Sequence, residues 1–175
     1  MSCRRHPVTR IPARPAGPAE IVVVGVGIDL CVIARLRRAM QGPAGARFRA
    51  RLFTDAEQRY CDARGRARMA SYAARFAAKE AVAKALATGI ADGIAWRDIE
   101  ILRGDDEPPT VVLSGGAADT ARRRRIARWH LSLTHTGGMA MAVAVGERGG
   151  VTRRRSRAAS AGEARASRRR PTDRR

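Results

Sequence analysis

The sequence predicts an α+β fold: a single domain over residues 21–147, with a mostly antiparallel sheet packed against a long central helix. Three observations lead to this fold class. Strand-like apolar runs stand near both ends of the region, an alanine-rich helical stretch stands in its middle, and most neighbouring strand runs are joined by hairpin turns. Residues 1–20 and 148–175 are basic and poor in large apolar residues, so we expect two disordered extensions.

The first elements follow from apolar runs and cap signals. Ile21–Ile28 is β-branched and nearly all apolar, which predicts a buried strand that delivers Asp29 at its end. The segment IARLRRAM predicts a short helix, broken by the Gly and Pro of QGPAG. Thr54 and Glu57 form a T-x-x-E capping box, which predicts the start of a helix that Arg64-Gly65 closes.

The longest helix is predicted from about Arg68 to Thr88, with Gly89 as its C-terminal cap. After it, DIEILRG and TVVLSG predict two strands joined by a polar turn, and GAADTARRRRIARW predicts another helix. The alternating segments WHLSLTHT and MAMAVAV predict two final strands, hinged at Gly137-Gly138.

Composition narrows the class of protein. No run approaches the eighteen apolar residues of a membrane span, so we expect no membrane association. The three cysteines, Cys3, Cys31 and Cys61, form no CxxC pair and predict neither a disulfide framework nor a zinc site. This cysteine usage fits a reducing compartment, and we therefore expect a cytoplasmic protein.

The two lysines of the chain, Lys79 and Lys84, both fall in the predicted long helix, although the chain has 35 basic residues. Phe76, Glu80 and Lys84 are spaced to share one face of that helix, and Arg75 and Lys79 lie one step round. A compact ammonium that can release a proton differs from a fixed guanidinium, so the retained lysines point to a site. A surface Glu-Lys pair that only stabilises the helix is the competing interpretation.

Asp29 is the second singular residue, because a charge at the end of an apolar strand either caps the next turn or faces a ligand. If Asp29 and Glu80 met, their oxygens would suit Mg²⁺, which binds few carboxylates together with substrate phosphates. The GVGID segment lacks the third glycine of GxGxxG, so we reject a dinucleotide-binding loop.

His135 ends a predicted strand and shares its face with Leu131 and Leu133, because side chains alternate along a strand. A structural histidine and a catalytic one both fit this position. A hydrolase pair of Ser132 with His135 is weaker, since there is no GxSxG elbow and no acid placed to orient the imidazole.

Four blocks, GVGIDL, LFTDAE, RFAAKEAVAKALATGI and LSLTHTGGMAMAVAV, stand in this order along the chain. In them the sequence resembles the holo-acyl-carrier-protein synthases, small phosphopantetheinyl transferases. The resemblance covers Val23 to Val145 and leaves both basic extensions outside it. It implies transfer of 4′-phosphopantetheine from coenzyme A to a serine of apo acyl carrier protein, with release of adenosine 3′,5′-bisphosphate. It also implies a homotrimer with sites at subunit interfaces.

Carried over residue by residue, the resemblance implies a set of site roles. Asp29 and Glu80 would bind Mg²⁺ with the coenzyme A diphosphate, and Lys84 and His135 would lie beside the same phosphates. Glu80 is the candidate base for the serine proton, and His135 is its rival. The other implied contacts are Arg75, Phe76, Lys79 and Thr136 for coenzyme A, and Arg35, Arg47 and Arg51 for the acidic carrier protein.

Two positions depart from the family pattern. Val32 stands where an acid is common, which bears on the surroundings of the metal or carrier. Ala87 stands where a glycine is usual after the KAL segment, and it adds a methyl group near the expected path of coenzyme A.

A basic nucleic-acid-binding protein is the alternative function, because arginine-rich segments bind phosphate backbones without reading sequence. Aromatic residues, at 4%, are scarce for base stacking, and no recognition motif is present. Arg122–Arg125 is the one basic run inside the domain, and four consecutive positions exceed one helical turn, so we expect a solvated face. Nucleic acid is expected to bind only non-specifically, through the C-terminal extension.

Overall fold

The computed structural model describes residues 21–90, 93–103 and 107–148. The expected disorder of residues 1–20 and 148–175 lies outside these ranges except at Arg148, which is the last residue of a strand and so contradicts that expectation. The helices and strands are, in chain order, β1 (Val22–Val32), α1 (Ile33–Gln41), α2 (Gly45–Leu52), α3 (Asp55–Asp62), α4 (Arg68–Ala85), β2 (Ile99–Leu102), β3 (Thr110–Leu113), α5 (Gly115–Arg123), β4 (Ile126–Thr136) and β5 (Met139–Arg148). Single turns of 3₁₀ helix cover Gly65–Ala67 and Trp96–Asp98.

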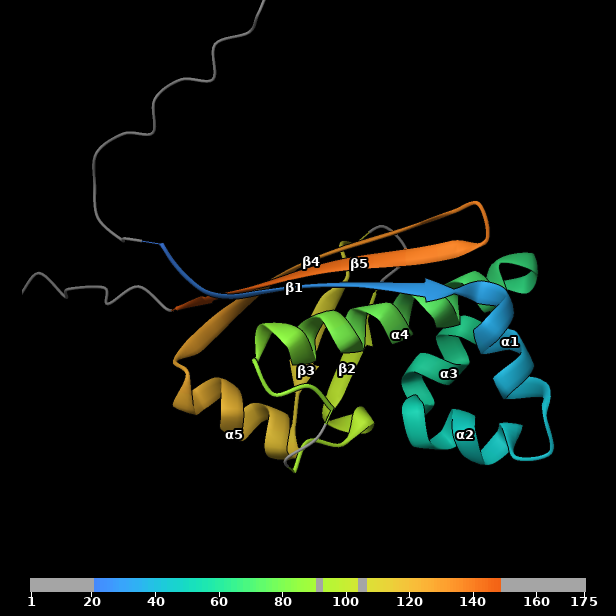
Figure 1. Cartoon of the computed structure of the whole chain (residues 1–175), viewed down its shortest axis with the longest axis horizontal. Coiled ribbons are helices and arrows are strands. Elements are labelled where there is room, and N and C mark those ends of the chain that lie inside the picture. The colour runs from blue at the N-terminus through green and yellow to red at the C-terminus, as the bar shows by residue number, and fades with distance from the viewer. Residues whose placement is uncertain (1–20, 91–92, 104–106, 149–175) are drawn as a thin grey trace, which may run out of the picture. The chain divides into compact units, whose positions relative to one another are not determined.

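Two antiparallel sheets and a long helix make up this α+β domain, which confirms the predicted fold class. The larger sheet has the order β1-β5-β4, and β2 pairs with β3 in the smaller one. Figure 1 shows the larger sheet lying along α4, with α1, α2 and α3 gathered at one end of that helix and α5 at the other. No helix in the described ranges has the length and apolar character needed to span a bilayer.

Strand β1 is longer than predicted and only half of it is buried. It runs on to Val32 because it pairs with β5 along its whole length, so Asp29 lies within the strand and not at its end. Gly27 and Cys31 on the face toward α4 are buried, whereas Ile28 and Leu30 on the other face are exposed. The prediction of a fully buried strand was therefore wrong for one face.

The helices α1 and α3 were predicted, and α2 was not. The Gly and Pro residues that end α1 are followed directly by the turns of α2, so the predicted break is only three residues long. The capping box is present: Thr54 N donates to Glu57 Oε2 at 2.8 Å, and Glu57 N donates to Thr54 Oγ1 at 3.3 Å. Helix α3 ends at Asp62, slightly before the predicted stop.

Helix α4 ends at Ala85, three residues before the predicted end, and its C-terminal turn is built on Ala87. Ala87 has a φ of 55°, in the left-handed region. Its N–H donates to Lys84 O at 2.9 Å, and Thr88 N donates to Ala83 O at 3.4 Å. These two bonds form a Schellman motif, whose left-handed position is usually glycine.

The α5–β4 boundary lies earlier than predicted. Helix α5 ends at Arg123, Arg125 is left-handed with a φ of 59°, and β4 begins at Ile126. The expectation of a solvated Arg122–Arg125 face was wrong for Arg124, whose guanidinium donates to Ala85 O at 3.1 Å and to Val24 O at 3.3 Å. The hinge at Gly137-Gly138 is confirmed, with φ values of 56° and 81°.

Candidate active site

The two glycines of the GVGID segment let strand β1 and helix α4 approach each other closely. A Cβ atom at Gly25 would lie 2.0 Å from Ala85 O, and one at Gly27 would lie 1.9 Å from Ala81 O. No side chain fits at such distances, so glycine is required at both positions. The alanines of α4 complete the contact, since Ala81 and Ala85 are buried.

This close approach brings Asp29 of β1 next to Lys84 of α4. Lys84 Nζ lies 2.8 Å from Asp29 Oδ1 and donates to Ile28 O at 2.9 Å. The Lys84 side chain keeps 49% of its surface exposed, whereas that of Asp29 keeps 17%. The ammonium can therefore still reach a ligand in solvent while it holds the carboxylate.

Glu80 belongs to the same cluster. Partial burial raises the pKa of Glu80, the negative charge of Asp29 raises it further, and the Lys84 ammonium opposes both. The structure thus places Asp29 close to Glu80 and Lys84, a meeting that the residue spacing could not show and that only the family resemblance implied. In the described ranges no group of three or more His, Cys, Asp or Glu side chains forms a metal cage. Two carboxylates fit Mg²⁺, which takes its remaining ligands from water and substrate phosphates.

An apolar pocket of about 560 Å³ opens beside this cluster, between β1, α1, α2 and α4. We call it the apolar pocket. Phe76 lines it and stacks on Trp96, with ring centroids 5.0 Å apart. Arg35 and Arg51 stand among its lining residues, next to apolar ones such as Leu36. Two of the three arginines predicted to face a carrier protein are therefore on one pocket, while Arg47 is exposed on α2 and does not line it.

A second pocket, of about 270 Å³, holds His135, and we call it the arginine pocket. Its lining residues include Arg64, Arg75 and Arg103 and no carboxylate. Arg75 is buried, and its guanidinium lies 3.9 Å from the ring centroid of Tyr60. Arg75 Nε has no hydrogen-bond partner within the described part of the chain. The pocket is thus positively charged and suited to an anion.

Asp29 and His135 do not meet within one chain. Asp29 pairs with Ala142 of β5, and Ala142 pairs with Leu133 of β4, so the two edge strands are separated by the central strand. Two interstrand spacings amount to about 10 Å. His135 lies two residues further along β4 and shares the inner face with Leu133, as predicted. Thr136 is exposed and alternates to the opposite face.

Comparison with known proteins decides the family. A model of the 4'-phosphopantetheinyl transferase superfamily matches residues 25–144. The chain belongs to this superfamily. The holo-[acyl-carrier-protein] synthase of Anaeromyxobacter dehalogenans strain 2CP-C is 47% identical over 131 residues, which make up 74% of this chain and 99% of that protein. That of Desulforudis audaxviator is 46% identical, over 71% of this chain and 92% of its own length.

Solved structures agree with the superfamily assignment. The holo-[acyl-carrier-protein] synthase of Neisseria meningitidis superposes with a TM-score of 0.65 and 29% identity, over 73% of this chain and 100% of that one. The Helicobacter pylori synthase, in complex with coenzyme A, gives a TM-score of 0.60 and 30% identity, over 69% of this chain and 98% of that one. The family resemblance read from the four sequence blocks is therefore confirmed.

In this phosphopantetheinyl transferase Lys79 does not have the predicted role. Its side chain is fully buried and forms an ion pair with buried Glu57 at 2.9 Å between Nζ and Oε2. An ammonium with no exposed surface cannot contact coenzyme A from solvent, so the prediction that Lys79 holds the phosphates was wrong. Helical spacing placed Lys79 one step from Glu80, but only the packing of α3 and β2 against α4 determines that this step leads into the core.

Several residues that shape the transferase site carried no functional signal in the sequence, or only a signal for another role. Trp96 gave no signal, because its stacking partner Phe76 is twenty residues away. Glu57 was recognised only as a cap, although it also holds the buried lysine. The glycines of GVGID were noted for a nucleotide motif and not for helix packing. The signal available for that close contact was the presence of two glycines in a predicted strand and of many alanines in the predicted long helix.

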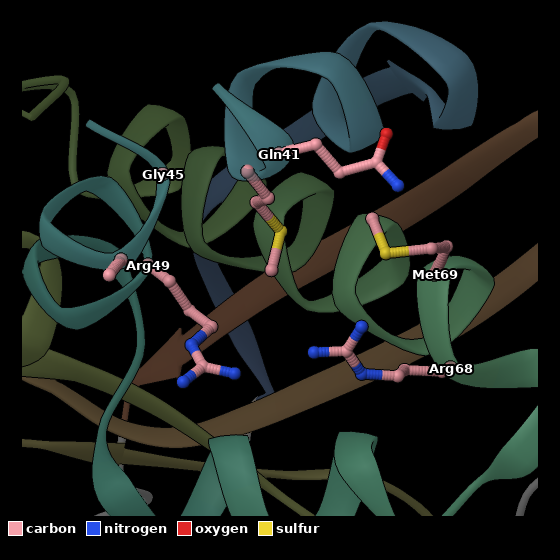
Figure 2. A pocket seen from close by; sticks show the side chains of 7 residues that line it. Gln41, Gly45, Arg49, Arg68 and Met69 are labelled. Atoms are coloured by element: carbon pink, nitrogen blue, oxygen red, sulfur yellow. The ribbon is translucent and has the colours of Figure 1, made fainter. Parts of the chain in front are cut away.

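A further pocket of the transferase, of about 210 Å³, lies between α1, α2 and the start of α4. Figure 2 shows the guanidinium groups of Arg49 and Arg68 reaching toward one another in it. Asp62 accepts from both, at 3.4 Å and 2.7 Å, and also from Tyr72 at 2.9 Å. Burial opposes ionisation of Asp62, but the hydrogen bonds from Arg68 and Tyr72 lower its pKa. This network ties three helices together outside the Asp29 cluster.

Proposed function

We propose that this chain is a holo-[acyl-carrier-protein] synthase, which transfers 4′-phosphopantetheine from coenzyme A to a serine of apo acyl carrier protein. The observation that carries this proposal is the cluster of Asp29, Glu80 and Lys84, in which two carboxylates and one half-exposed ammonium meet where β1 crosses α4. The curated relatives with 46% and 47% identity are named for this activity. Adenosine 3′,5′-bisphosphate is the proposed second product.

Asp29 and Glu80 are the proposed ligands of Mg²⁺. Bound there, the ion supplies Lewis-acid stabilisation of the charge on the coenzyme A diphosphate. Lys84 bonds to Asp29 in the free protein, and its exposed half lets it turn to a phosphate oxygen when the donor binds. This exchange frees the Asp29 carboxylate for the metal. The ammonium then stabilises the leaving phosphate electrostatically, the usual source of catalysis in phosphoryl transfer.

Glu80 is the proposed acceptor of the serine proton, directly or through water. The serine oxygen attacks the pantetheine-side phosphorus, its proton passes to a base, and the bond from that phosphorus to the departing bisphosphate breaks. Burial and the charge of Asp29 raise the pKa of Glu80 in the metal-free chain, and a bound Mg²⁺ would oppose that shift. The support for Glu80 as the base is therefore its place in the Asp29 cluster and not its pKa. His135 remains the rival base, and it is exposed on β4.

The arginine pocket is the proposed site for coenzyme A phosphates. Three guanidinium groups and the His135 imidazole surround it without a carboxylate, so a ligand with several negative charges compensates them. Arg75 Nε, which is buried and has no partner in the described ranges, offers one such ligand a donor. Thr136 is assigned to coenzyme A by the family resemblance alone.

The apolar pocket is the proposed docking site of the carrier protein. Arg35 and Arg51 flank an apolar floor that contains Phe76 and Trp96. An acidic, amphipathic surface fits this combination, because the rim arginines steer and orient it while apolar side chains fill the floor. Arg47, exposed on the same helix as Arg51, extends the positive rim.

A homotrimer is the proposed assembly, and its subunits would complete the site. Val26, Ile28 and Leu30 on the outer face of β1 are 59%, 53% and 58% exposed in the single chain. A second copy of the chain packed on this face of β1 would also bring its own His135 close to Asp29, which His135 of the same chain does not reach.

Sedimentation analysis should give three chains per particle. Val26→Arg, which lies outside the apolar pocket, should release monomers that have lost transfer activity. A monomeric wild type with full activity would contradict this assembly.

Mass spectrometry of the carrier protein tests the proposed function directly. The chain is mixed with Mg²⁺, coenzyme A and an apo carrier, and we expect the mass of one phosphopantetheine group to be added to the carrier. Removal of divalent metal with a chelator should stop the transfer, and added Mg²⁺ should restore it. An unmodified carrier at high enzyme concentration would reject the proposal.

The alternative function, nucleic-acid binding through the arginine-rich tail, concerns residues 149–175, which lie outside the described ranges. Truncation after residue 148 separates the two functions. Transfer should persist in the truncated chain while any salt-sensitive binding of nucleic acid is lost. A cytoplasmic location likewise remains a proposal, and fractionation of cells with an antibody to the chain tests it.

A further inference from the structure

A buried ion pair joins the catalytic helix to its surroundings one residue before Glu80. Lys79 Nζ lies 2.9 Å from Glu57 Oε2, and both side chains are fully buried. The same ammonium donates to the backbone carbonyl oxygens of Trp96, at 3.0 Å, and Ile99. All three partners of this ammonium come from other elements of the fold: α3, the 3₁₀ turn at Trp96–Asp98, and β2.

Glu57 is as fully engaged as its partner. Oε2 also accepts from Thr54 N at 2.8 Å, and Oε1 accepts from Ile101 N at 3.0 Å. One carboxylate therefore fixes the start of α3 and the backbone of β2, and through Lys79 it fixes α4. The link to Trp96 matters for the site, because the Trp96 ring stacks on Phe76 in the wall of the apolar pocket.

The cost of burying these charges indicates what they contribute. Two ions removed from water lose much of their hydration, and well-packed apolar side chains often replace a buried pair without loss of stability. Burial lowers the pKa of Lys79, against the opposing effect of Glu57. Apolar residues could fill the same volume, but they could not aim three hydrogen bonds at fixed atoms of three elements. The fixed directions of these hydrogen bonds, and not a gain in stability, therefore explain why the two positions are charged.

We propose that Lys79 and Glu57 are a positioning pair that holds Trp96 against Phe76 and thereby sets the shape of the apolar pocket for the carrier protein. Neither residue touches the substrates. The inference rests on the proposed transfer reaction, because it assigns the pair to the binding of the acceptor in that reaction.

The test compares two double variants with matched size. Glu57→Gln with Lys79→Met removes both charges and the donors to Trp96, whereas Asp62→Asn with Arg68→Gln removes an exposed ion pair that also joins α3 to α4. Both are built in a Trp129→Phe background, so that Trp96 becomes the only tryptophan. We measure the melting temperature, quenching of Trp96 fluorescence by acrylamide, and the steady-state constants for carrier and coenzyme A.

For the buried-pair variant we expect a folded protein with roughly twofold stronger quenching of Trp96 and about a tenfold higher KM for the carrier. The KM for coenzyme A should change much less. The Asp62/Arg68 variant should keep the quenching and both KM values of its Trp129→Phe parent. An unchanged carrier KM and unchanged quenching in a folded Glu57/Lys79 variant would overturn the proposal and leave the pair a purely structural one.

A second variant covers the case in which the first does not fold. Glu57→Gln with Lys79→Gln keeps amide donors and acceptors in place of the ions, and we expect it to raise the carrier KM by a smaller factor. If this amide pair is folded and its carrier KM and Trp96 quenching equal those of the parent, the proposal fails. If the parent itself transfers nothing, the proposed function fails instead, so the two failures are distinguishable.

Discussion

The Lys84 ammonium lies 2.8 Å from the Asp29 carboxylate and joins helix α4 to a strand 55 residues earlier in the chain. The contact exists only because two glycines let the helix backbone approach the strand. Lys84 also donates to the strand backbone at Ile28, so the strand fixes where the ammonium stands. In the proposed reaction this pair is the arrangement of charge that the coenzyme A diphosphate and Mg²⁺ would meet.

Lys84→Arg should lower the turnover number of phosphopantetheine transfer roughly tenfold to a hundredfold. The guanidinium is longer and planar, so it cannot place one compact charge at the phosphate oxygen to which the Lys84 ammonium turns in the proposed mechanism. Mass spectrometry of the carrier at saturating substrates measures the effect. Arg122→Lys, at an exposed pair on α5, is the control and should keep full activity. Equal rates for Lys84→Arg and wild type would remove Lys84 from the mechanism.

Gly27→Ala should cost about 3 kcal/mol of stability and abolish transfer, because its Cβ would overlap Ala81 O and push β1 away from α4. Chemical denaturation measures the loss. Gly42→Ala is the matched control, since the nearest atom to its Cβ, Arg38 O, is 3.7 Å away. A Gly27→Ala protein as stable as the Gly42→Ala protein would show that the close contact is not needed.

Glu80→Gln should stabilise the protein at neutral pH while it stops transfer. The pKa of Glu80 is raised in the folded chain by burial and by Asp29, so the folded state holds this proton more tightly than the unfolded state. Stability therefore falls as the pH rises from the ordinary glutamate pKa through the raised one. The melting temperature of the variant should exceed that of wild type near pH 7, and the difference should vanish below about pH 4. A lower melting temperature at pH 7 would contradict the assigned sign.

Ala87→Gly should raise the free energy of unfolding by about 0.5 to 1 kcal/mol, because Ala87 holds a left-handed conformation that costs little only for glycine. Thermal melts followed by circular dichroism measure the gain. Ala46→Gly, at an exposed position inside α2, should lose about 1 kcal/mol instead. If both changes destabilise the protein, the C-terminal turn of α4 is not strained by the alanine.

Cys31 and Cys61 should resist alkylation in the native protein. Burial raises the pKa of Cys31 to about 11 and that of Cys61 to about 12, so almost no thiolate is present at pH 8. Peptide mapping after treatment with iodoacetamide should find both thiols free in the folded chain and modified in the denatured chain. Rapid native modification of Cys31, which lines the apolar pocket, would show that this pocket opens in solution.

Local signals predicted most of the elements, and they failed where a distant partner decided the outcome. The Thr54–Glu57 capping box is local, so it was predicted and is present. Strand β1 was predicted four residues too short, because its last residues pair with β5, more than a hundred residues away. The start of β4 was read as helix for a similar reason: Ile126 follows a run of arginines, and only its pairing with β5 determines that it is extended.

The sequence by itself determined the α+β class, the family blocks and the face of α4 that carries Glu80 and Lys84, because helical and strand periodicities are properties of neighbouring residues. Only the tertiary structure decided which charged residues remain at the surface. Lys79 and Lys84 lie on the same helix in similar local sequence. Lys79 is nevertheless fully buried against Glu57, whereas Lys84 is half exposed beside Asp29. Burial depends on which elements pack around a helix, and that packing is set by contacts across the whole fold.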